Sequence, residues 1–107
     1  MTQSRKRVSL KSISAERQNL IVCMHKKQFG TIRNLPVVEG EPLLQEAKVV
    51  RKRNLSKQDD SKPVSPNYYL KVAQLRLLDT LDEIHDGVLD RITFRDGLPC
   101  ELEECTT

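Results

Sequence analysis

The sequence contains no tryptophan, and aromatic residues make up only 4% of its 107 positions. A hydrophobic core must therefore consist mainly of Leu, Ile and Val, and a chain of this length fits one domain. No apolar run approaches the roughly 18 residues of a membrane span, and no hydrophobic stretch of signal-peptide type follows the cationic N-terminus. We therefore expect a small cytoplasmic protein with an aliphatic core.

Cysteine and glycine are also scarce, and their positions argue against several kinds of site. The three cysteines, Cys23, Cys100 and Cys105, are an odd number without a familiar spacing, which disfavours a secreted disulfide scaffold and a zinc site. The four glycines are all accounted for by expected helix ends and turns, so no glycine loop is left to hold a phosphate. The acidic pairs Asp59-Asp60, Asp82-Glu83 and Glu103-Glu104 are expected in a polar link, on a helix surface and in a tail, where they are simply solvated and need no catalytic role. We expect no metal, no cofactor and no enzymatic activity.

A thirteen-residue pattern occurs twice at an offset of 57, in residues 30–42 and 87–99. Both copies read G-x-[IL]-x-x-[LI]-x-[VF]-x-[ED]-G-x-P. Continuing the register backwards pairs apolar positions of two helical segments: Leu20 with Leu77, Ile21 with Leu78, and Met24 with Leu81. A fixed offset of this kind predicts an internal repeat.

Each copy follows a segment with helical apolar spacing. The first helix is expected to begin at Ser14, whose hydroxyl can cap it, and to stop at Gly30 in a left-handed conformation. The second is expected to begin with Ser65 as cap and Pro66 in the first turn, and to stop at Gly87.

Each helix is expected to lead into a β-hairpin. The turns are Glu39-Gly40 and Asp96-Gly97, since Gly tolerates the positive φ that a tight turn needs. Because one helix and one hairpin cannot bury their apolar sides alone, the two units should pack together. The predicted fold class is α+β: a two-layer sandwich from a duplicated helix-plus-hairpin unit (αββαββ), with four mostly antiparallel strands and two helices on one face.

This reading divides the chain into an arm, one domain and a tail. The expected segments are a flexible basic arm at 1–12, a single domain at 13–102 and an acidic tail at 103–107. Within the domain, the first repeat covers 14–44, a basic link covers 45–64 and the second repeat covers 65–102.

Positive charge is concentrated in one half of the chain. Residues 1–53 hold twelve Lys or Arg against four acids, whereas residues 54–107 hold six against eleven. Clustered cations can neutralise the phosphates of nucleic acid, although attraction between the two halves of the fold would also account for the division. The candidate nucleic-acid-binding residues are Arg5, Lys6, Arg7, Lys48, Arg51, Lys52 and Arg53.

Other elements could also meet a nucleic acid. If a hairpin entered a groove, Arg33 and Asn34, or Arg91 and Arg95, would face the DNA, but the simpler reading places them on the solvent side of the hairpins. The adjacent tyrosines Tyr68 and Tyr69 fit a structural role at a helix start better than stacking on a base.

The run Phe29-Gly-Thr-Ile-Arg-Asn-Leu-Pro-Val-Val-Glu-Gly-Glu-Pro42, with Lys48-Val-Val-Arg51 and Asp96-Gly-Leu-Pro99, resembles a pattern in small uncharacterised bacterial proteins. The resemblance covers residues 29–100. It implies a bacterial, cytoplasmic origin and brings no activity or functional residue with it.

Two functions remain open at this point. The first is a non-enzymatic module that binds nucleic acid through the basic arm and link. The alternative is a protein-interaction or assembly module that uses an open sheet face or edge to bind another protein chain or a second copy of itself.

Overall fold

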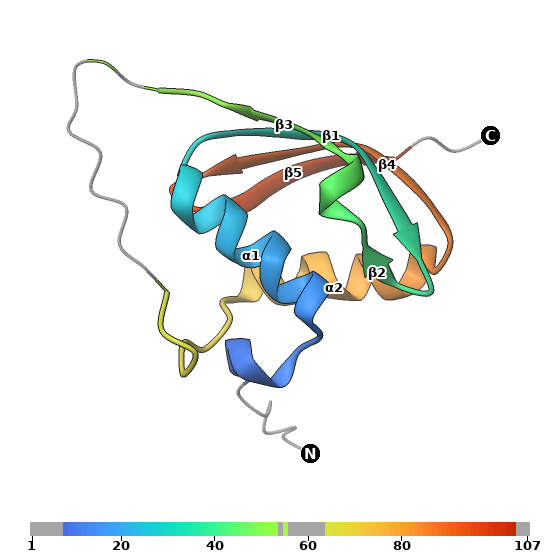
Figure 1. Ribbon diagram of the computed structural model, residues 1–107, viewed down its shortest axis with the longest axis horizontal. Coiled ribbons are helices and arrows are strands. Elements are labelled where there is room, and N and C mark those ends of the chain that lie inside the picture. The colour runs from blue at the N-terminus through green and yellow to red at the C-terminus, as the bar shows by residue number, and fades with distance from the viewer. Residues whose placement is uncertain (1–7, 54, 56–63, 105–107) are drawn as a thin grey trace.

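A computed structural model of the protein describes residues 8–53, 55 and 64–104. It is an α+β protein with two α-helices and an antiparallel sheet, which confirms the expected class (Figure 1). In chain order the elements are the 3₁₀ turn η1 (Leu10–Ser12), α1 (Ala15–Lys27), β1 (Gly30–Val38), β2 (Glu41–Pro42), the 3₁₀ turn η2 (Leu44–Glu46), β3 (Lys48–Arg51), α2 (Val72–Ile84), β4 (Gly87–Arg95) and β5 (Leu98–Glu104).

Helix α1 begins where its sequence predicts. The Ser14 hydroxyl accepts a hydrogen bond from the Arg17 backbone N–H at 3.3 Å, which satisfies one donor of the first turn. The expected stop at Gly30 is wrong, because the left-handed residue after the helix is Gln28, with φ 68°. Helix α2 likewise ends at His85, with φ 60°, and not at Gly87.

The start of α2 lies well after the expected one. The helix begins at Val72, whereas Ser65 and Pro66 lie before it in a turn and an extended segment. The side-chain oxygen of Gln74 accepts a hydrogen bond from the Lys71 backbone N–H at 2.8 Å and so helps to cap the helix. The Ser65-Pro66 capping pattern therefore does not mark the start of this helix.

The segment before α2 is extended because it pairs with the N-terminal part of the chain. The Leu10 N–H donates to the Tyr68 carbonyl at 2.7 Å, and the Leu70 N–H donates to the Val8 carbonyl at 2.8 Å. Leu10 is buried. Residues 8–12, which were expected to belong to a flexible arm, are thus part of the folded domain.

Both hairpin turns form as expected. Glu39 and Gly40 have φ of 52° and 77°, and Asp96 and Gly97 have φ of 54° and 79°. Positive φ at both central residues defines the type I′ turn, whose twist suits two antiparallel strands.

The sheet has the strand order β2-β1-β4-β5, and β3 also pairs with β1. It therefore has five strands and not four. The additional strand, β3, lies in the segment 45–64 that was expected to be a link, and it pairs with the first half of β1 from Gly30↔Arg51 to Arg33↔Lys48. The short β2 pairs with the other end of β1, so Pro36, which has no N–H to donate, lies between the two partners.

The core lies between the sheet and the helices. Both helices lie on the same side of the curved sheet (Figure 1). They contribute Leu20, Ile21, Met24, Leu77 and Leu81, and the sheet contributes Ile32, Leu35, Leu89, Ile92 and Phe94, all at most 2% exposed. We call the opposite side of the sheet, which no helix in the described residues covers, the outer face.

The two helix-plus-hairpin segments correspond position by position at the offset of 57. The helices span 15–27 and 72–84, and the central strands span 30–38 and 87–95. Each hairpin turn also contacts the end of the other segment's helix. The Gly40 N–H donates to the His85 carbonyl at 2.7 Å, and the Gly97 N–H donates to the Gln28 carbonyl at 2.9 Å. These reciprocal bonds connect each turn to the opposite helix.

Gly30 and Gly87 occupy matching positions but have different surroundings, which allows a controlled test. A Cβ at Gly30, where φ is 154°, would lie 2.0 Å from the Val50 carbonyl oxygen, whereas a Cβ at Gly87 would meet only the Ile84 side chain at 3.1 Å. We expect Gly30→Ala to lower the free energy of unfolding by about 3 kcal/mol. Gly87→Ala should change it by about 1 kcal/mol or less. Urea denaturation followed by circular dichroism measures both, and equal losses would contradict the assigned role of Gly30.

Candidate nucleic-acid interface

The structure describes four of the seven candidate binding residues. Lys48 and Arg51 lie in β3, and Lys52 and Arg53 follow it directly. Arg5, Lys6 and Arg7 lie outside the described residues.

The four cations of this segment do not all face the same way. Along β3, Lys48 and Val50 are exposed, whereas Val49 and Arg51 are partly buried, as the alternation of a strand requires. Val49 packs against the core, so Arg51 shares the helix side of the sheet. Lys48 is on the outer face. The segment thus divides its cations between both faces, and Arg51 is separated from the group in which the sequence placed it.

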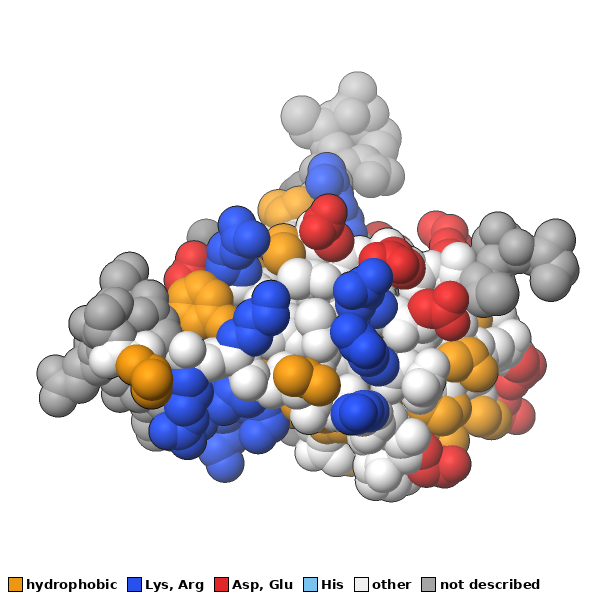
Figure 2. Space-filling model, turned by 90° about the horizontal axis from the view of Figure 1, so that it is seen from above, with side chains coloured by type: hydrophobic (Ala, Val, Ile, Leu, Met, Phe, Trp, Pro, Cys, Tyr) orange, Lys and Arg blue, Asp and Glu red, His pale blue; other side chains and the backbone are white. Residues whose placement is uncertain are grey.

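The outer face instead gathers cations from three neighbouring strands. Lys48 pairs with Arg33, and Arg33 pairs with Arg91, so the three residues form a line across β3, β1 and β4. We call these three residues the cation row. Figure 2 views this face and shows Lys and Arg side chains gathered over its middle and one end, with Asp and Glu side chains beside the central group as well as toward the margins.

Among the described residues, one member of the cation row has an acidic partner. Arg91 forms an ion pair of 2.8 Å with Glu103, its neighbour on β5. Within that same part of the chain, the side chains of Arg33 and Lys48 form no ion pair or hydrogen bond, and both are exposed. Like charges directly opposite each other in a sheet repel, so this row is electrostatically unfavourable in the protein alone.

The ion pairs also bear on the alternative that the charged halves of the chain attract each other. Arg17 of α1 pairs with Asp82 of α2, and this contact joins the two halves. It lies on the helix layer. In the part of the chain that the structure describes, no comparable contact neutralises Arg33 or Lys48, so attraction between the halves does not account for the outer face.

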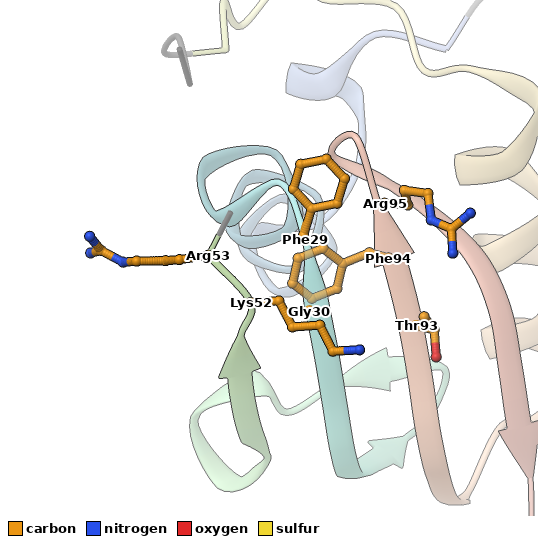
Figure 3. Close-up of a pocket in the computed structure, with 7 residues that line it drawn as sticks. All are labelled: Phe29, Gly30, Lys52, Arg53, Thr93, Phe94 and Arg95. Atoms are coloured by element: carbon orange, nitrogen blue, oxygen red, sulfur yellow. The ribbon is translucent and has the colours of Figure 1, made fainter. Parts of the chain in front are cut away.

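A cavity of about 260 Å³ opens where β1 begins and β4 ends, displaced along the strands from the cation row. Its lining residues are Phe29, Gly30, Lys52, Arg53, Thr93, Phe94 and Arg95. We call it the end pocket. Figure 3 shows the Lys52 side chain extending toward Thr93, the Phe29 ring beside the Phe94 ring, Arg95 on the far side of β4, and Arg53 pointing away from the others.

Gly30 makes the floor of the end pocket. A Cβ at this position would lie 3.0 Å from the tip of the Phe94 ring, so the absence of a side chain lets that ring pack against the β1 backbone. Phe94 is only 1% exposed, whereas Phe29 is partly buried and presents its ring at the side. A hydrogen bond of 2.8 Å from the Lys52 N–H to the Phe29 carbonyl holds the two pocket walls together.

Sequence reasoning did not assign Phe29 or Thr93, two of the uncharged residues that line the end pocket, to a binding surface. It named Arg33, Arg91 and Arg95 only as residues that a groove-binding hairpin would use. The structure instead places these arginines on one open sheet face through strand alternation and the β1–β4 register. The Asp96-Gly97 turn could have revealed this shared face. It fixes the end of the strand at Arg95, and side chains two residues apart along a strand lie on the same face, so Thr93 and Arg91 lie on the face of Arg95.

The remaining reactive side chains do not gather into a second site. Tyr68 donates a hydrogen bond to Gln74 at 3.2 Å and lies beside the His25 ring, so it serves the fold. Burial raises the pKa of the Cys23 thiol. Across residues 8–53, 55 and 64–104, no three His, Cys, Asp or Glu side chains are close enough together to hold a metal ion. Among those residues, no helix is long and apolar enough to cross a membrane.

Comparison of the chain with protein-family models, with curated proteins and with solved structures gives no match.

The repulsion within the cation row should be measurable as stability. Replacing Arg33 by Gln removes the charge that faces both Lys48 and Arg91. We expect Arg33→Gln to raise the free energy of unfolding at low salt by about 0.5 kcal/mol or less, and the gain should vanish as salt screens the charges.

The matched control is Arg76→Gln, which removes one exposed positive charge from α2, away from the sheet. Thermal unfolding at low and high salt compares the two variants. A loss of stability in Arg33→Gln that does not depend on salt would show that Arg33 contributes packing and not repulsion.

Proposed function

We propose that this protein is a small non-enzymatic module that binds nucleic acid on the outer face of its sheet. The observation that carries the proposal is the cation row, in which two of three cations lack an acidic partner among the described residues. A polyanion laid across the row would turn this repulsion into attraction. The proposed binding surface is therefore the outer face of the sheet, extended by Lys52 and Arg53. The proposal also includes Arg5, Lys6 and Arg7 of the arm.

The physical basis is the neutralisation of phosphates. Each Lys or Arg that contacts a phosphate releases condensed counterions, so affinity falls steeply with salt. Adjacent strands lie about 4.8 Å apart, so the three cations of the row span about 10 Å and can meet two or three consecutive phosphates. Such contacts hold the backbone without reading its sequence.

The end pocket favours nucleic acid over other polyanions. An anionic membrane or an acidic peptide would use the cations but would not need an aromatic ring beside them. Phe29 lies next to Lys52 in the pocket wall. Base–aromatic stacking together with a basic groove is the usual means by which proteins hold single-stranded nucleic acid.

We also propose that the scaffold arose as a duplicated helix-plus-hairpin unit in two layers. The equal bounds of the helices and central strands at the offset of 57 support this. Backbone conformation also matches at this offset. Gln28 and His85 both have positive φ, and so do the central residues of both hairpin turns. A duplication would have supplied one sheet face with two copies of each position, free to diverge in charge.

Binding should depend on the outer face and on salt. We expect a labelled single-stranded oligonucleotide to bind at low salt and to lose affinity steeply toward physiological salt. Replacing Arg33 and Lys48 together by Gln should reduce the slope of log K against log salt by about 1.4, since each phosphate contact on a single strand contributes about 0.7. Fluorescence anisotropy at several salt concentrations measures this slope.

Arg76→Gln again provides the control, since it removes a positive charge from the helix layer. It should leave the slope unchanged. The absence of any binding at low salt, or an equal effect of the control, would contradict the proposed surface.

A second candidate function is assembly through the sheet edges, and the charges on these edges favour it. The β3 edge carries Lys48 and leads into Lys52, whereas the β5 edge carries Glu101 and Glu103. Glutamates along an edge strand repel a second strand that carries acidic residues, but they attract a strand that carries Lys or Arg. A β3 edge could therefore pair with the β5 edge of a second copy, and such a head-to-tail contact would not close on itself.

Light scattering tests this second candidate. If the edges pair, the average mass at low salt should rise with protein concentration, and Glu101→Lys should abolish the rise because it places a cation opposite β3. A constant monomer mass over the whole range would refute edge pairing.

A further inference from the structure

The end pocket combines three chemical features within one small cavity. Phe29 supplies an aromatic side wall, Thr93 supplies a hydroxyl, and Lys52 extends toward that hydroxyl (Figure 3). Arg95 is a second cation of the lining, and its side chain lies on the side of β4 away from Phe29 (Figure 3). An aromatic surface with cations on two sides matches a planar base that carries a phosphate.

The size of the cavity limits the ligand. Pockets for small molecules usually measure about 300–1,000 Å³. At about 260 Å³ the end pocket lies just below this range, so it suits one nucleotide and not a dinucleotide cofactor.

The opposite end of the sheet shows that the fold does not require these lining residues. Gly30 has a counterpart in Gly87 at the offset of 57, but the pocket walls do not repeat. The counterparts are Asp86 for Phe29, Pro36 for Thr93 and Val38 for Arg95. Both ends of the sheet have the same hairpin turn and the same helix end. The Phe29 ring and the Arg95 cation are therefore not needed to form the turn or the helix end.

We propose that the end pocket binds one unstacked nucleotide of a single-stranded nucleic acid, with its base against Phe29 and its phosphate between Lys52 and Arg95. The inference rests on the proposed function, because the same strand would continue over the cation row. Arg95 lies four residues from Arg91 along β4, which is about 13 Å at 3.3 Å per residue. A strand of about four stacked nucleotides covers that distance. A duplex cannot place a base in the pocket without unpairing it.

The absence of tryptophan makes a direct test available. In the Phe29→Trp variant the new side chain is the only indole in the protein, so its fluorescence reports on the end pocket alone. We expect an oligothymidylate of about eight nucleotides to quench this fluorescence. The matched control is Val38→Trp, which puts the reporter at the counterpart of Arg95, 48% exposed at the far end of β1, and which should respond weakly.

A second measurement does not depend on the tryptophan variant folding. Anisotropy with the unaltered protein compares the oligothymidylate with an abasic strand of equal length, which keeps the phosphates and lacks the bases. We expect the strand with bases to bind at least about tenfold more tightly, and Phe29→Leu, which keeps an apolar side chain, to remove most of that difference.

The outcomes separate the pocket from the function on which it rests. Equal affinity for both strands, or a duplex that binds as tightly as the single strand, would overturn the pocket proposal while leaving the cation row in place. If thymidine monophosphate quenches the fluorescence of the Phe29→Trp variant but no oligonucleotide binds at low salt, the end pocket takes free nucleotides only, and both the single-stranded occupant and the sheet-face function are refuted. If no nucleotide in any form binds, both proposals fail.

Discussion

The pairing of β1 with β4 at the centre of the sheet determines the rest of the structure. Ile32 faces Ile92 and Leu35 faces Leu89 across this pair, and all four side chains are fully buried beneath the helices. Ile32 and Ile92 point toward the helices, so alternation turns the next pair, Arg33 and Arg91, to the outer face. The positive φ of 53° at Asn34 interrupts this alternation, and Leu35 lies in the core again. A shift by one residue would expose the core, so the hydrophobic free energy of the core holds two like charges together.

This coupling explains how a small aliphatic domain can maintain an unfavourable surface. The reciprocal bonds from Gly40 to His85 and from Gly97 to Gln28 add further restraint, because they fix each hairpin turn to the helix end of the other segment. Natural proteins commonly retain such local conflicts where a ligand resolves them. The cation row fits that pattern, and a phosphate backbone has the charge and the spacing that would relieve it.

Much of the scaffold could be predicted from the sequence, because its signals are local. The Ser14 cap, the apolar spacing of Leu20 and Met24, and the turns at Gly40 and Gly97 each depend on neighbouring residues. The start of α2 and the strand β3 could not be predicted in the same way. Ser65 and Pro66 satisfy a helix start locally, but pairing between distant segments around Val8 and Leu70 keeps this stretch extended.

The candidate site was predicted less well for the same reason. Cation clusters in the sequence drew attention to residues 48–53, although alternation sends Arg51 to the other face and the fold adds Arg33, Arg91 and Phe29 from elsewhere. The register between distant strands is what unites them. The two segments related by the offset of 57 have helices and central strands with matching bounds, and their residues at matching positions differ in charge.

The most direct test of this account is to titrate the isotope-labelled full chain with a single-stranded oligonucleotide and follow the backbone amide signals by NMR. The account predicts shifts along β1, β3 and β4 at Arg33, Lys48, Arg91 and Thr93, with α1 and α2 unaffected. Shifts confined to the helices, or none at low salt, would contradict the claim that the outer face of the sheet is the binding surface.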